Sequence, residues 1–156
     1  MAKVIRVDHI AFAVRNLEES RRALEQNYGA KFLAMAENPL QKYVVATFQF
    51  GENLISLLQA TDESSFVAKF VEERGEGVQH IGLEVDNIEE FVANLESKGV
   101  RVPVKQMTGD GRKEVLVGPR SGFGVVMQII EWKDGPDVPL EQRIERSTRY
   151  ISLGGG

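Results

Sequence analysis

The chain has 156 residues, of which 42% are hydrophobic, so it can bury the core of one domain or of two small halves. Its formal net charge of -4 argues against general binding to nucleic acid or to an anionic membrane surface. The absence of cysteine excludes disulfides, thiolate metal sites and cysteine nucleophiles. No stretch has the apolar length needed to cross a bilayer, and we expect a cytoplasmic protein.

The first half of the chain predicts a strand, a helix and three further strands. Residues 4–14 alternate as a strand does, which places His9 on one face with Ala11 and Ala13. Asn16 and Glu19 then have the form of a helix cap, and Gly29 supplies the end of that helix. Further strands are expected at residues 31–36, 43–50 and 54–59.

The second half repeats this order after a linking helix. Residues 62–74 predict that helix, with Asp62 or Ser64 as its N-cap. A strand at 78–85 and a helix capped by Asn87 and Glu90 follow. The remaining strands are expected at residues 100–104, 114–117 and 124–131.

The two halves open on nearly the same phrase. Residues 8–19 read D-H-I-A-F-A-V-R-N-L-E-E, and residues 79–90 read Q-H-I-G-L-E-V-D-N-I-E-E. The only two histidines of the chain, His9 and His80, occupy the second position of each copy. Because imidazole is the commonest protein metal ligand, this placement indicates one shared site.

This pattern resembles the vicinal oxygen chelate superfamily, which includes glyoxalases, bleomycin resistance proteins and dioxygenases. Within it, the sequence is most similar to methylmalonyl-CoA epimerases. The similarity lies in V-D-H-I-A-F-A-V, S-F-V-A-K-F-V-E-E-R-G-E-G-V-Q-H-I and G-P-R-S-G-F-G-V-V-M-Q-I. The resemblance implies an α+β fold in which two βαβββ modules form a cupped, mostly antiparallel sheet.

The domain organisation follows from the same resemblance. Residues 1–132 would form one domain of two repeats, at about 4–59 and 78–132, linked by the helix at 62–74. Residues 133–156 would be a C-terminal tail with a short helix from Leu140 to about Tyr150. We expect this tail either to be a solvated appendage or to cover the pocket mouth or a partner subunit.

The resemblance also implies a divalent metal ion, of which Co, Zn, Mn, Ni and Fe are candidates. Carried over position by position, its ligands fall on His9, Ser56, His80 and Gln128. The family has Glu or Gln at the position of Ser56 and usually Glu at that of Gln128. Two histidines and a neutral amide would leave the ion with its full charge, so we expect weaker metal binding.

The reaction that the resemblance implies is proton transfer alpha to the carbonyl of a small acyl thioester. A carboxylate that some epimerases carry on the third strand falls at about Val45 and is missing. Glu84, four residues after His80 on the same strand face, is the candidate base, with a surface position as the alternative. Arg112 and Lys113, after Gly109-Asp110-Gly111, could meet a CoA phosphate, although a plain hairpin loop explains them too.

Two other functions remain open at this point. One is another activity of the superfamily, such as a lyase or a dioxygenase; the other is a metal-free protein that binds a small molecule without catalysis. The partners expected are a small acid or an acyl-CoA and a second copy of the chain in a homodimer. Neither nucleic acid nor a membrane is expected as a partner.

Overall fold

The computed structural model describes residues 1–106 and 111–154. The chain divides into two compact units. Unit 1 consists of residues 1–9 and 80–138, and unit 2 of residues 10–79 and 139–156. Strands β1 (Val4–Ala13) and β5 (Gly77–Val85) each contribute residues to both units.

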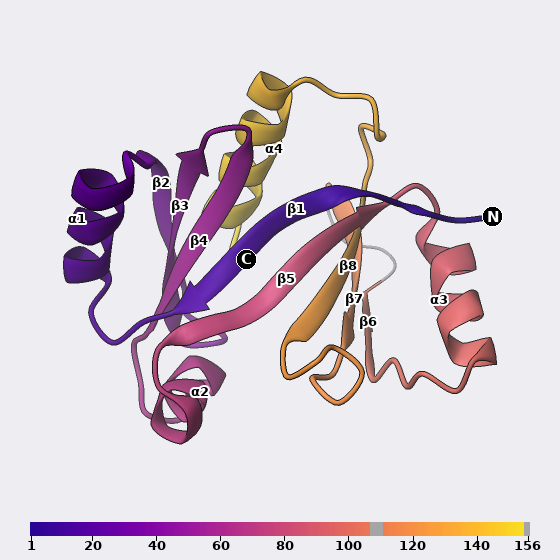
Figure 1. Cartoon of the computed structure of the whole chain (residues 1–156), viewed down its shortest axis with the longest axis horizontal. Helices are drawn as coiled ribbons and strands as arrows, with labels where there is room; N and C mark the ends of the chain where they lie inside the picture. Colours follow the sequence, from indigo (N-terminus) through magenta and orange to yellow (C-terminus); the bar gives the residue numbers. More distant parts are fainter. Residues whose placement is uncertain (107–110, 155–156) are drawn as a thin grey trace. The chain divides into compact units, whose positions relative to one another are not determined.

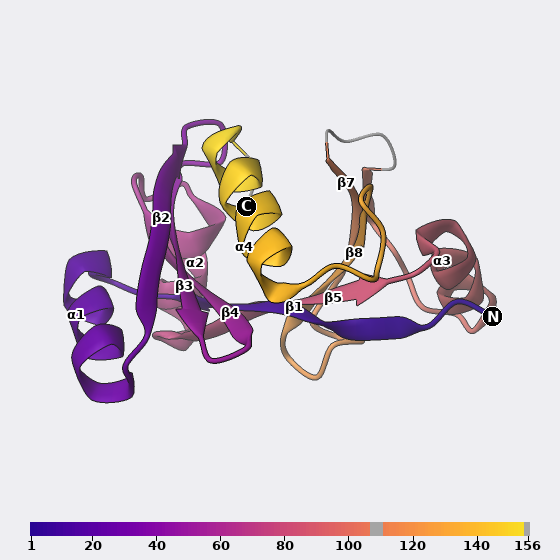
Figure 2. The same cartoon turned by 90° about the horizontal axis from the view of Figure 1, so that it is seen from above.

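Unit 2 contains the first βαβββ module. Its strands lie in the order β2-β3-β4-β1, with β1 parallel to β4 and the other neighbours antiparallel. Helix α1 packs on one face of this sheet and α4 on the other (Figure 2). The elements are α1 (Leu17–Tyr28), β2 (Lys31–Asn38), β3 (Tyr43–Phe50), β4 (Asn53–Ala60), α2 (Phe66–Arg74) and α4 (Leu140–Ser152).

Unit 1 contains the second module with the same connectivity. Its strands lie in the order β5-β8-β7-β6, with β5 parallel to β8 and the other neighbours antiparallel. Helix α3 lies beside this sheet (Figure 1), and its apolar side packs on the buried valines of β7. The elements are α3 (Ile88–Ser97), β6 (Val104–Gln106), β7 (Arg112–Val117) and β8 (Val126–Trp132). The predicted α+β class and the paired βαβββ order are confirmed.

The predicted helix caps at the start of α1 and α3 are also confirmed. Asn16 Oδ1 accepts a hydrogen bond from the Glu19 amide at 3.0 Å, and Asn87 Oδ1 does the same for Glu90. The linking helix differs, because Ser65 caps it instead of Asp62 or Ser64. Asp62 instead accepts hydrogen bonds from Ser64 within the preceding turn.

Two strand predictions in the second half were misplaced. Residues 100–103 precede β6, because Pro103 offers no amide to a strand ladder and Val102 is buried against the core around α3. The last strand begins at Val126 instead of Gly124, whose φ of 88° lies in the left-handed region. At these two positions, short apolar runs did not indicate where ladder pairing begins.

Helix α4 belongs to unit 2 and is not a solvated appendage. Its Ile151 is 6% exposed and packs with Tyr43, Val45 and Leu58 on the sheet face opposite α1. Asn38 Nδ2 donates to the carbonyl of Gly154, just beyond the helix, at 3.0 Å. The tail thus completes the core of the first module. None of the helices in the described residues is long and apolar enough to span a membrane.

We expect Ile151→Ala to lower the free energy of unfolding by about 2–4 kcal/mol, because it leaves a cavity over Tyr43 and Val45. Leu153→Ala is the control, since Leu153 is 70% exposed and its truncation should change stability by less than about 0.5 kcal/mol. Urea unfolding followed by circular dichroism measures both. Equal effects of the two substitutions would show that α4 does not contribute to the core.

Candidate functional site

The structure brings the two histidines together within unit 1. His9 lies on β1 and His80 on β5, and their Nε2 atoms are 3.1 Å apart with the ring planes at 87°. Two nitrogens bound to one ion at about 2.0–2.1 Å are about 2.9 Å apart at a right angle and about 3.3 Å apart at the tetrahedral angle. The observed separation therefore suits either a hydrogen bond or two ligands of one metal ion.

Asp8 fixes the orientation of the His9 ring. Asp8 Oδ2 lies 2.8 Å from His9 Nδ1, while Asp8 Oδ1 accepts a hydrogen bond from Trp132 Nε1 at 2.8 Å. A carboxylate at Nδ1 places the ring proton there and leaves the lone pair of Nε2 directed at His80. Strand alternation predicts that Asp8 and His9 point to opposite faces. Asp8 is nevertheless 2% exposed and contacts the His9 ring.

Electrostatics favour an ionised Asp8 and a neutral His80. Burial opposes ionisation of Asp8, but the hydrogen bond and charge of His9, the charge of Arg112 and the Trp132 hydrogen bond hold its pKa below its usual range. Burial, with repulsion from His9 and Arg112, lowers the pKa of His80 well below that of free imidazole. Neutral imidazole is the form that binds a metal.

Glycine at position 82 makes room for the His9 ring. A Cβ atom on Gly82 would lie 2.7 Å from His9 Cε1 and 2.8 Å from Nδ1. Gly82 is also the ladder partner of Gln128 on β8. Because paired residues point to the same face of a sheet, Gln128 and the His9 ring share that face.

Gln128 is held by a carboxylate that the sequence argument overlooked. Its Nε2 donates to Glu114 Oε2 at 2.6 Å, and the same oxygen accepts a hydrogen bond from Arg112 at 3.0 Å. Gln128 is 3% exposed, and its buried Oε1 accepts no hydrogen bond from the described residues. An amide oxygen in this condition can serve as a metal ligand.

Glu114 is the counterpart in the second module of Val45 in the first. Val45 pairs with Leu58, two residues beyond Ser56, and Glu114 pairs with Ile130, two residues beyond Gln128. The second module therefore has a carboxylate at the position where the first has a valine. This equivalence rests on the ladder registers of β3 with β4 and of β7 with β8.

Ser56 lies in unit 2, on β4. Its side chain is buried, and its hydroxyl lies 3.5 Å from Thr47 Oγ1 on the adjacent strand. Its ladder partner on β1 is Ala11, just as that of Gln128 is Gly82. The structure therefore gives Ser56 the place in its module that Gln128 has in the other.

Glu84 is a buried ion-pair residue. Its carboxylate contacts the Arg6 guanidinium at 2.5 Å, and its side chain is 1% exposed. A substrate could reach this carboxylate only if the ion pair opened. The surface alternative for Glu84 is wrong, and its position argues against a role as base.

Arg112 and Lys113 are both engaged in ion pairs. Arg112 is 4% exposed, contacts Glu114 and lies over the Trp132 ring at 5.1 Å. Lys113 contacts Glu89 at 2.5 Å and Glu131 at 3.7 Å. The buried position of Arg112 argues against binding of a solvent-exposed phosphate. Residues 109 and 110 of the expected loop lie outside the described residues.

The residues fit a divalent ion only if an amide takes part. Within residues 1–106 and 111–154, no group of three or more histidine and carboxylate side chains is placed to hold a metal ion. His9, His80 and the free oxygen of Gln128 offer two imidazoles and one amide, which are acceptable ligands for Zn, Co, Ni or Fe. Asp8 and Glu114 supply the negative charge from behind two of these ligands.

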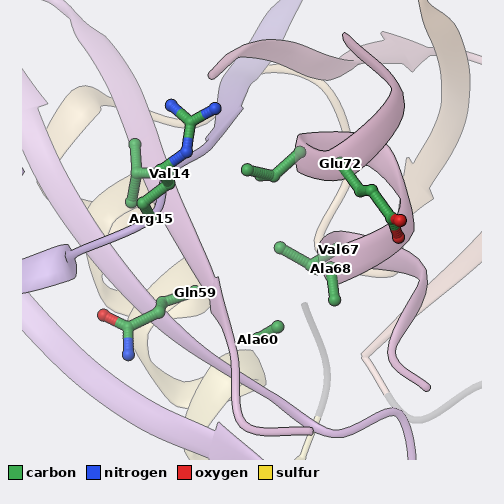
Figure 3. Close-up of a pocket in the computed structure, with 8 residues that line it drawn as sticks. Val14, Arg15, Gln59, Ala60, Val67, Ala68 and Glu72 are labelled. Atoms are coloured by element: carbon green, nitrogen blue, oxygen red, sulfur yellow. The ribbon is translucent and has the colours of Figure 1, made fainter. Parts of the chain in front are cut away.

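The structure also has a cavity that is lined by other residues. It has a volume of about 340 Å³ and lies in unit 2, where side chains of α2 face the ends of β1 and β4 (Figure 3). None of the predicted site residues lines it. Its lining residues are Val14, Arg15, Gln59, Ala60, Val67, Ala68, Val71 and Glu72.

Comparisons with known proteins identify a family and several relatives of this chain. Residues 8–116 match the Glyoxalase/Bleomycin resistance protein/Dioxygenase superfamily. The uncharacterized protein YqjC of Bacillus subtilis (strain 168) is 29% identical over 130 residues, which cover 82% of this chain and 93% of that protein. The mitochondrial methylmalonyl-CoA epimerase of Dictyostelium discoideum is 30% identical over 130 residues, which cover 81% of this chain and 78% of that protein.

Solved structures share the fold. A variant of Streptomyces coelicolor methylmalonyl-CoA epimerase in complex with 2-nitronate-propionyl-CoA superposes with a TM-score of 0.74. The match covers 88% of this chain and all of that one, at 24% sequence identity.

We expect Gly82→Ala to displace the His9 ring and to lower stability by about 1–3 kcal/mol, because the added methyl overlaps Cε1. Gly77→Ala on the same strand is the control, since its Cβ would meet nothing within 4 Å. Imidazole nitrogen NMR can follow the change, because only two histidines give signals. An unchanged His9 spectrum in Gly82→Ala would contradict the ring position.

Proposed function

Because the chain belongs to the glyoxalase/bleomycin resistance protein/dioxygenase superfamily, we propose that it is a divalent-metal-dependent epimerase or isomerase. The reaction would move a proton alpha to the carbonyl of a small acyl thioester, such as methylmalonyl-CoA. The facing Nε2 atoms of His9 and His80, with Asp8 behind His9, carry this proposal. They place two imidazole nitrogens where one ion could meet both.

His9, His80 and Gln128 would hold the ion. Bound there, it would supply positive charge beside the thioester oxygen, which becomes more negative as the alpha proton leaves. Ser56 is left out of this set, because a neutral hydroxyl is a poor ligand and its oxygen lies near Thr47.

Carboxylates near the site would partly balance the positive charge of an ion that has only neutral ligands. Asp8 and Glu114, which contact His9 and Gln128, are two carboxylates, and Arg112 beside Glu114 is one guanidinium, so these groups leave a net negative charge. A divalent ion would therefore enter surroundings that are slightly negative. This arrangement would favour binding even though no carboxylate of the described residues completes a metal-ligand group.

Glu114 is the proposed proton acceptor. Its Oε2 is held by Gln128 and Arg112, and its Oε1 makes no hydrogen bond with the described residues. Its side chain is 19% exposed, in contrast to the buried Glu84. An ionised carboxylate with one anchored and one open oxygen can accept a proton without losing its position.

The dioxygenase alternative has less support. A non-haem iron site of that type uses two histidines and a directly bound carboxylate. Here Glu114 faces the amide nitrogen of Gln128, and the amide supplies the third donor. A metal-free binding protein is the remaining alternative, and metal analysis separates it from the enzyme.

We expect the purified protein to bind about one Co, Zn, Mn, Ni or Fe ion per chain and to exchange the alpha proton of methylmalonyl-CoA in deuterated water. His80→Asn should abolish both, because it removes one of the two facing nitrogens. Elemental analysis and mass spectrometry measure the two properties. A wild-type protein that retains no ion and exchanges no proton would overturn the proposed function.

At saturating metal concentration, Glu114→Gln should slow proton exchange by about 10²–10⁴-fold, the range for loss of a general base. Glu84→Gln should lower stability through loss of its ion pair with Arg6 while retaining most of the exchange rate. The opposite order of effects on exchange would assign the base to Glu84, as the sequence argument expected.

A further inference from the structure

We propose that Glu114 is a positioning residue that sets the direction and the charge of the Gln128 amide oxygen. The Glu114 and Gln128 pair would then act together in place of a single carboxylate ligand. This inference rests on the proposed function, because it concerns metal binding at the same residues. The proposed function uses Glu114 Oε1 as the proton acceptor, and the present inference adds a role for Oε2, which contacts Gln128.

The contact between these two residues fixes the amide. Gln128 Nε2 lies 2.6 Å from Glu114 Oε2, a short hydrogen bond to an ionised acceptor. Rotating the amide by half a turn would bring two oxygens together and remove this bond. The orientation that leaves Oε1 without a hydrogen bond is therefore the stable one.

Glu114 is itself fixed by a chain of buried contacts. Arg112 donates to its Oε2 at 3.0 Å and lies over the ring of Trp132 at 5.1 Å. Trp132 in turn donates to Asp8, which holds His9. One set of contacts thus supports both Gln128 and His9.

The two supports have the same physical effect. A carboxylate behind an imidazole or an amide polarises it, and the donor atom on the far side becomes more negative. Asp8 does this for His9 Nε2, and Glu114 would do it for Gln128 Oε1. Negative charge that a ligand carboxylate would bring directly is therefore supplied one hydrogen bond away.

The test is cobalt affinity, measured by titration calorimetry and by the visible absorption of bound Co(II). We expect Glu114→Gln to weaken binding by about 10–100-fold, the usual effect of losing such a support. Glu96→Gln is the matched control, because it removes the same charge from an exposed pair with Lys105 in the same unit. The control should bind cobalt as the wild type does.

A second pair of variants separates this role from a general effect on folding. Gln128→Glu alone puts two carboxylates in contact, so we expect the metal-free protein to be less stable. Gln128→Glu combined with Glu114→Gln exchanges the two groups and keeps one carboxylate and one amide in contact. We expect this double variant to recover cobalt affinity to within about threefold of the wild type.

Each result has one meaning. A wild-type protein that binds no cobalt, or any other candidate ion, would overturn the proposed function itself. Cobalt binding by the wild type with equal affinity in Glu114→Gln would leave the proposed function standing and overturn the role of Glu114. A double variant as weak as Glu114→Gln would also overturn it, because a carboxylate and an amide in contact would then not act in place of a single carboxylate ligand.

Discussion

The buried carboxylate of Asp8 is the interaction on which the candidate site depends. It accepts hydrogen bonds from a residue of β1 and a residue of β8, and so joins the start of the chain to the last strand of unit 1. A carboxylate with 2% exposure is costly unless its oxygens are paired, and here each has a donor. The same bonds orient His9 toward His80. Asp8 therefore both links the strands and positions a residue of the candidate site.

The two modules have the same connectivity but different inner faces. In unit 2, Val45 packs beside Ile151 of α4 on the face opposite α1, and Ser56 lies near Thr47 at the position that corresponds to Gln128. In unit 1, the equivalent positions carry Glu114 and Gln128, which bond to each other. A valine at position 45 has a packing explanation, since a buried charge beside Ile151 would have no partner in that apolar cluster.

The repeat predicted the fold well, because cap residues and alternation recur in both halves and each βαβββ order follows from local pattern. It also singled out His9 and His80. Asp8 was missed because strand alternation assigns adjacent residues to opposite faces, whereas its carboxylate bonds to the neighbouring His9 ring. Glu114 was missed because its significance depends on ladder register with β8, which no local pattern contains. The packing of α4 likewise depends on contacts made across more than a hundred residues.

Because α4 covers one of the two modules, equivalent positions of the two halves tolerate different substitutions. At Val45 a substitution is tolerated according to its volume and polarity, because it must fit against Ile151. At Glu114 it is tolerated according to charge and hydrogen-bonding capacity, because it must serve Gln128 and Arg112. The two repeats therefore restrict substitutions differently: fit to an apolar cluster decides at Val45, and charge and hydrogen bonding decide at Glu114.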